Sequence, residues 1–139
     1  MVTFVLDTSA IFRYVDNEAG ADRVTEIFQA QASGTARIVL SAIHWGEVAG
    51  IVLKRQGTQA VDTVLTGLRS LPLEIVPATA NRAERCAFVK FKYKIPYADA
   101  FGVELAGTSP DHILVTADFD VKPAAQDISI EFLPLKPKA

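Results

Sequence analysis

The sequence has few residues that bind zinc or form disulfides: one cysteine, Cys86, and two histidines in 139 residues. A single cysteine cannot form a disulfide within the chain, which favours a reducing, cytoplasmic compartment. The histidines and the cysteine show none of the spacings of zinc sites. Any metal centre is therefore expected to use oxygen ligands.

Long apolar runs and an excess of positive charge are also missing. No run approaches the ~20 residues of a membrane-spanning helix, and residues 1–6 lack the basic flank of an export signal. We therefore expect no membrane partner. A net charge of −2 argues against a protein that coats nucleic acid through its overall charge. It leaves open an enzyme that cuts nucleic acid at an acidic metal site.

Two common groups of catalytic motifs are absent. The eight glycines form neither a Walker loop nor a dinucleotide-binding loop. The Gly-x-Ser-x-Gly turn of serine hydrolases is missing as well. The composition, 50% hydrophobic and 22% charged, is that of a globular protein, and the length fits one domain over residues 1–139.

Apolar segments that end at capping or turn residues predict an alternation of strands and helices. Strands are predicted at residues 2–6, 36–40, 73–76, 112–116 and 128–133. Helices are predicted within residues 10–16, 19–32, 41–55, 58–68, 78–92 and 96–105. This alternation predicts an α/β fold with a mainly parallel sheet covered on both faces.

Several carboxylates stand in apolar surroundings. Asp7 directly follows the first strand, and Asp118 and Asp120 follow the fourth, where parallel sheets bind ligands. Helix capping or a turn would also explain each of them singly. Glu47 is predicted on or beside a buried helical stripe, with an ion pair as the alternative. Asp99 lies in the first turn of an apolar helix, where the helix dipole also favours an acid.

Taken together, these acids predict a metal centre. Carboxylates gathered at one end of a sheet repel one another unless they hold a hard cation such as Mg²⁺ or Mn²⁺. A cation held in this way suits phosphodiester hydrolysis, because it activates a water molecule and balances charge on the phosphate.

The same segments resemble a known family. Residues 5–10 (VLDTSA), 43–48 (IHWGEV), 96–101 (PYADAF) and 114–120 (LVTADFD) are similar to the motifs of PIN domains, and most of all to VapC toxins of type II toxin–antitoxin systems. The resemblance extends over essentially the whole chain. It implies a three-layer α/β/α sandwich, Mg²⁺- or Mn²⁺-dependent endoribonuclease activity, a homodimer, and inhibition by a VapB antitoxin.

The resemblance also implies roles for individual residues. The catalytic acids would be Asp7, Glu47, Asp99 and Asp118, and the metal ligands among them Asp7, Asp99 and Asp118. Ser9 and Thr116 match supporting hydroxyl positions. Asp120 either replaces Asp118 or joins it.

Basic residues offer candidate contacts to RNA. Lys92 and Lys94 lead into the segment of Asp99 and are predicted to meet RNA phosphates. Arg13 follows Asp7 by one or two helical turns and would contact phosphate or form a surface salt bridge. The interleaved aromatics Phe88 and Phe91 are expected to be buried.

Two other functions remain open at this point. A catalytically silent PIN-fold module would bind a partner, but the presence of all four acids argues against it. A phosphatase of the haloacid-dehalogenase type also has an aspartate after its first strand. Such enzymes carry a second aspartate two residues later, where this chain has Ser9.

Overall fold

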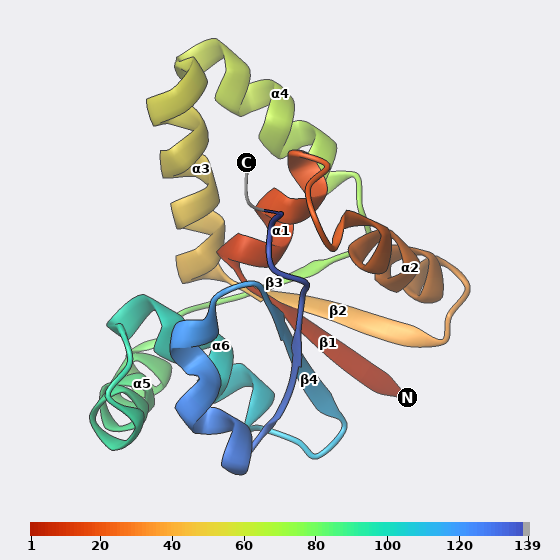
Figure 1. Ribbon diagram of the computed structural model, residues 1–139. Helices are drawn as coiled ribbons and strands as arrows, with labels where there is room; N and C mark the ends of the chain where they lie inside the picture. The colour runs from red at the N-terminus through yellow and green to blue at the C-terminus, as the bar shows by residue number, and fades with distance from the viewer. Residues whose placement is uncertain (138–139) are drawn as a thin grey trace.

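The protein is built on one sheet of five parallel strands. The computed structural model describes residues 1–137, and the strands follow the order β3-β2-β1-β4-β5 (Figure 1). The strands are β1 (Val2–Leu6), β2 (Ala36–Ser41), β3 (Glu74–Val76), β4 (His112–Thr116) and β5 (Ser129–Phe132). Every pairing between them is parallel, which confirms the predicted α/β class.

Six α-helices and one 3₁₀ segment surround the sheet. They are α1 (Thr8–Val15), α2 (Ala21–Ala32), α3 (Ala42–Gln56), α4 (Thr58–Arg69), α5 (Ala80–Tyr93), α6 (Tyr97–Ala106) and the 3₁₀ segment η1 (Phe119–Gln126). The α-helices agree with the predicted ranges to within two residues. The 3₁₀ segment was not predicted, because it lacks a helical apolar stripe and contains Pro123. None of the helices among residues 1–137 is long and apolar enough to cross a bilayer.

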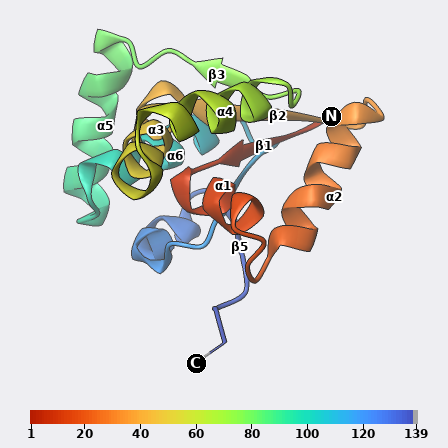
Figure 2. The ribbon, with the colours of Figure 1, turned by 90° about the horizontal axis from the view of Figure 1, so that it is seen from above.

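The alternation of side chains along β1 divides the core into two layers. Phe4 and Leu6 pack on the face covered by α1, α2, α3 and α4. Val5 points to the opposite face, which α5, α6 and η1 cover (Figure 2). Strands buried on both faces are rich in apolar side chains, as the centres of β1, β2 and β4 are. The result is the three-layer α/β/α arrangement.

The register of the two central strands brings distant residues together. Leu6 of β1 lies opposite Val115 of β4, so the residues that follow, Asp7 and Thr116, leave the sheet side by side. This edge is the carboxyl end of the sheet, where the predicted acids gather.

The C-terminal segment, residues 133–137, crosses from β5 to α1 (Figure 2). Leu133 is buried and packs so closely on Gly20 that a Cβ there would lie 3.0 Å from the Leu133 Cβ. Arg13 of α1 donates a 2.6 Å hydrogen bond to the carbonyl of Pro134. Lys136 forms a 2.9 Å ion pair with Glu18. Three contacts thus hold this segment beside the carboxyl end of the sheet.

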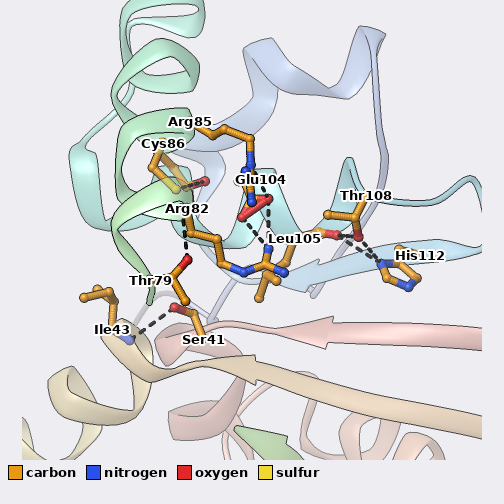
Figure 3. Close-up of polar contacts among 11 residues, drawn as sticks. Ser41, Ile43, Thr79, Arg82, Arg85, Cys86, Glu104, Leu105, Thr108 and His112 are labelled. Carbon is orange, nitrogen blue, oxygen red and sulfur yellow. Dashed lines mark hydrogen bonds and ion pairs between the residues drawn. The ribbon is translucent and has the colours of Figure 1, made fainter. Parts of the chain in front are cut away.

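The basic helix α5 differs from its predicted arrangement. Arg82 and Arg85 approach Glu104 of α6 at 2.6 and 3.7 Å (Figure 3). Glu104 is buried, so this ion pair joins the two helices rather than facing RNA. Phe88 and Phe91 are 72% and 85% exposed, and the expectation that they are buried is wrong. We refer to the exposed surface of α5 that carries these two side chains as its outer face.

Candidate active site

Asp7 is the most firmly held of the acids. It caps α1, and its Oδ1 accepts hydrogen bonds from the Ala10 amide (3.0 Å) and the Ser9 hydroxyl (2.6 Å). Its Oδ2 accepts a short hydrogen bond from the Thr116 hydroxyl. The carboxylate is 7% exposed. Three donors therefore fix its orientation at the junction of β1 and β4.

Ser9 and Thr116 connect this carboxylate to the loop after β4. The Ser9 Oγ accepts a hydrogen bond from the Ala117 amide at 2.8 Å. The Thr116 Oγ1 accepts one from the Asp118 amide at 2.9 Å. Each hydroxyl thus donates to Asp7 and accepts from the backbone beside Asp118, so both hold the two acidic segments in place.

Three further acids form a cluster next to Asp7. One carboxylate oxygen from each of Asp99, Asp118 and Asp120 lies within 4.8 Å of the others. Asp118 caps η1 by accepting a 2.9 Å hydrogen bond from the Asp120 amide. This tight turn brings both acids toward Asp99. Asp120 therefore joins Asp118 in the cluster and does not replace it.

The environment of Asp99 disfavours its negative charge. Burial is the main cause, followed by the charge and hydrogen bond of Asp118, and together with Asp7 and Asp120 these raise the pKa of Asp99 to about 7. The Asp99 Oδ2 is buried and has no hydrogen-bond partner among residues 1–137. An unpartnered oxygen among several carboxylates is a donor suited to a hard cation such as Mg²⁺. The residues therefore fit a divalent ion of this kind.

Glu47 lies at the rim of the site. It accepts a 2.7 Å hydrogen bond from the Thr8 hydroxyl. The buried stripe of α3 runs through His44 and Val48, and Glu47 stands beside it with an exposed side chain. The acid is thus available to solvent and to a substrate.

Sequence reasoning did not identify His44 as a residue of this region. His44 is 2% exposed, and its Nε2 lies 3.0 Å from the carbonyl oxygen of Ala98, the neighbour of Asp99. A carbonyl only accepts, so the Nε2 carries the hydrogen. A Cβ at Gly102 would lie 3.1 Å from the Leu114 Cδ1 and 3.4 Å from the His44 Cε1, so this glycine lets α6 pack closely against both side chains. A polar residue one turn before Glu47 on an apolar helix face was the available signal.

A cleft of about 480 Å³ connects these residues along α1. Its acidic end contains Asp7, Glu47, Asp99 and Asp118. Toward the C-terminal end of α1, three cations line it: Arg13, Arg55 and Lys136. The cleft therefore has one strongly negative end and one end of mixed charge.

The predicted RNA contacts take up different positions. Arg13 lines the cleft but is 7% exposed and donates to the carbonyls of Ala19 and Pro134, both at 2.6 Å. Lys92 pairs with Asp127 at 3.4 Å. Lys94 ends α5 in a left-handed backbone conformation, with a φ of 56°. Neither lysine is among the residues that line the cleft.

Comparison with known families identifies the fold. The sequence profile of the PIN domain matches residues 4–126. The chain belongs to the PIN domain family. PIN domains are typically metal-dependent nucleases and generally use divalent ions. The acidic cluster of Asp99, Asp118 and Asp120 offers oxygen ligands for such an ion.

Solved structures similar to this PIN domain include toxins and toxin–antitoxin complexes. DNA-bound VapBC from Salmonella typhimurium has a TM-score of 0.74 at 21% identity, covering 95% of this chain and 98% of its own. DNA-bound VapBC2 from Rickettsia felis has a TM-score of 0.69 at 17% identity, with coverages of 96% and 100%.

A third similar structure is a toxin whose target is named. VapC20 of Mycobacterium tuberculosis, which cleaves the sarcin–ricin loop, has a TM-score of 0.68 at 16% identity, covering 94% of this chain and 99% of its own. No curated protein sequence matches this chain significantly. The structural likenesses therefore support the fold, and function is argued from the site.

Proposed function

We propose that this PIN domain is an Mg²⁺- or Mn²⁺-dependent endoribonuclease and acts as the toxin of a cytoplasmic VapBC-type system. The observation that carries the proposal is the meeting of Asp99, Asp118 and Asp120 beside Asp7, with a buried Asp99 oxygen that lacks a partner. Such a set of oxygens suits a cation that takes part in phosphodiester hydrolysis.

In this proposal, some of the residues hold the ion and others act on the substrate. A bound divalent ion supplies Lewis-acid chemistry, by lowering the pKa of water and balancing phosphate charge. Asp7, Asp99 and Asp118 would hold it, with Asp120 as a fourth carboxylate. Ser9 and Thr116 keep Asp7 oriented.

Glu47 has a separate role in this proposal. Its carboxylate is exposed at the rim and positioned by the Thr8 hydroxyl. It is therefore placed to accept a proton from the attacking water.

Two protein partners belong to the proposal. The similar structures include VapBC complexes from Salmonella typhimurium and Rickettsia felis, which supports a VapB-type antitoxin as a partner of this chain. A second copy of the chain is proposed to cover the outer face of α5, where Phe88 and Phe91 are exposed.

The function is tested by RNA cleavage. We expect purified protein to cut single-stranded or looped RNA with Mg²⁺ or Mn²⁺ and to stop when EDTA is added. Asp99→Asn should lose at least ~100-fold in rate, because the amide keeps the shape but not the charge that holds the ion. It should remain folded, because it removes a repelling charge from the cluster.

The alternative is a silent PIN-fold module that only binds a partner. No cleavage by either protein would favour that alternative, whereas equal cleavage by wild type and Asp99→Asn would overturn the assignment of the metal site. Calorimetry of Mn²⁺ binding provides a second measurement. Binding by the wild type that Asp99→Asn lacks would support the metal site independently of any RNA substrate.

A further inference from the structure

Three cations from separate parts of the chain converge on the cleft at the C-terminal end of α1. Arg13 belongs to α1, Arg55 to α3 and Lys136 to the C-terminal segment. We refer to these three residues as the basic end of the cleft. The acids at the opposite end would repel an RNA strand, so a cationic counterpart in the same cleft requires an explanation.

Arg13 is a buried cation without a carboxylate partner among residues 1–137. It is 7% exposed, and both of its hydrogen bonds leave from Nη1 to neutral carbonyls, those of Ala19 and Pro134. The Nε and Nη2 groups have no hydrogen-bond partner within the described chain. A buried charge that is not neutralised favours an anion beside it.

Arg55 and Lys136 have partners that a phosphate could replace. Arg55 pairs with Asp16 at 3.1 Å and Lys136 with Glu18 at 2.9 Å. Both pairs lie at the surface, where ion pairs contribute little to stability and exchange readily. The guanidinium of Arg55 also lies 4.9 Å from the centre of the Phe12 ring, which holds it at the cleft wall.

We propose that the basic end binds a backbone phosphate of a single-stranded RNA whose scissile phosphate lies at the acidic end. This inference rests on the proposed function and extends it from the reaction to the path of the substrate. The strand runs along α1, from Thr8 at the acidic end past Phe12. The C-terminal segment contributes Lys136 to the site, so its attachment through Arg13 serves binding as well as folding.

The test measures RNA binding in the Asp99→Asn background, where cleavage does not interfere. A fluorescently labelled single-stranded RNA oligonucleotide is titrated by anisotropy at several salt concentrations. Each lost phosphate contact lowers the slope of log K against log salt by about 0.7 for single strands. Because the basic end is proposed to bind one phosphate, Arg55→Gln with Lys136→Gln should lower the slope by up to about 0.7 and weaken binding at low salt.

A matched pair of variants removes the same charge elsewhere. Arg37→Gln with Lys122→Gln, an exposed arginine and lysine that do not line the cleft, should leave the salt slope unchanged. A third variant, Asp16→Asn with Glu18→Gln, releases the two cations from their pairs and should tighten binding. All the replaced side chains lie at the surface, and thermal melting checks that each variant is folded.

The outcomes separate the two proposals. Equal slopes for the cleft pair and the Arg37–Lys122 control pair, in proteins that bind RNA, would overturn the basic end as a phosphate site and leave the nuclease intact. No RNA binding by the parent protein, together with no cleavage by the wild type, would overturn the proposed function and this inference with it.

Discussion

Asp99 is the acid whose surroundings differ most from those of a free aspartate. Its pKa rises from 3.8 to about 7, mainly through burial and then through Asp118. The folded protein thus binds a proton that the unfolded chain releases near pH 4. The stability gained from this proton is complete below pH ~4 and is lost as the pH rises through about 7.

The metal-free protein should therefore be less stable at pH ~7 than at pH ~5. Thermal melting in EDTA over this range should show a falling transition temperature for the wild type. Asp99→Asn should flatten the decline, because it removes the titrating group. An unchanged decline in the variant would assign the effect to another residue.

The affinity for the metal should depend on pH in the opposite direction to the stability of the metal-free protein. The ion requires ionised carboxylates, so its binding releases the proton, and affinity should rise with pH up to about 7. Calorimetry of Mn²⁺ in buffers of different ionisation enthalpy would measure the released proton. No proton release at pH ~6 would contradict the raised pKa of Asp99.

The sequence predicted the acids better than it predicted their supports. Asp7 and Asp118 follow strands whose apolar runs are evident, and parallel pairing places such ends together. The partners of Arg13 and His44 could not be predicted, because they are carbonyls of Ala19, Pro134 and Ala98. Every residue has a backbone carbonyl, so the sequence does not show which of them accepts a side-chain hydrogen bond.

At the scale of elements, α3 and α6 meet through one buried side chain. The His44 ring spans from α3 to the Ala98 carbonyl and occupies the space beside Gly102. Glu47 follows His44 by one turn, and Asp99 follows Ala98 directly. This contact therefore joins the segments that carry two of the proposed catalytic acids, Glu47 and Asp99.

Replacing His44 should weaken metal binding through Asp99. His44→Leu removes the donor to Ala98, and we expect Mn²⁺ affinity to fall by about 10-fold, as for other residues that orient metal ligands. His44→Gln retains an N–H donor and should recover part of the affinity. His44 has only a packing role if both variants lose the same thermal stability in EDTA and show no difference from each other in Mn²⁺ affinity.

The α5–α6 pair depends on a buried ion pair. Glu104 accepts two hydrogen bonds from Arg82, at 2.6 and 3.0 Å. Removing one partner of a buried pair costs ~3–5 kcal/mol, and the nearby Arg85 reduces that cost here. We expect Arg82→Met to lower the free energy of unfolding in urea by about 2 kcal/mol. Arg82→Met with Glu104→Met should recover much of the loss, and no recovery would show that Arg82 acts through packing alone.

The positions of the α-helices and strands could be predicted from apolar periodicity. The η1 segment and the exposed aromatics of α5 could not. The η1 segment depends on Asp118 capping a proline-containing turn, which has no helical stripe. The exposure of Phe88 and Phe91 could not be predicted, because buried and partner-facing aromatics share the same spacing. Only the packing of α5 on α6 decides which face of that helix is outermost.

At the scale of the whole molecule, the outer face of α5 carries the most exposed aromatic side chains among the described residues, Phe88 and Phe91. Phe88 and Phe91 lie one turn apart. If two copies of α5 packed antiparallel, Phe88 of each copy would contact Phe91 of the other. Such a self-complementary patch is what a twofold dimer requires.

Light scattering at micromolar concentration should therefore give about twice the chain mass of 15.0 kDa. Phe88→Ser with Phe91→Ser should shift the protein to the monomer, because the contact loses most of its apolar area. Leu135→Ser, which alters an exposed apolar residue of the C-terminal segment, should leave the dimer intact. A monomeric wild type would contradict the dimer.

The pairing of β1 with β4 also determines when the protein acquires its site during synthesis. Asp7 is translated 109 residues before its Thr116 partner. A nascent chain that lacks residues 112–120 has neither the second central strand nor two of its clustered acids. The site is therefore incomplete until β4 and the loop after it have been translated. For the proposed endoribonuclease, this order of assembly would protect the RNA of the ribosome that makes it.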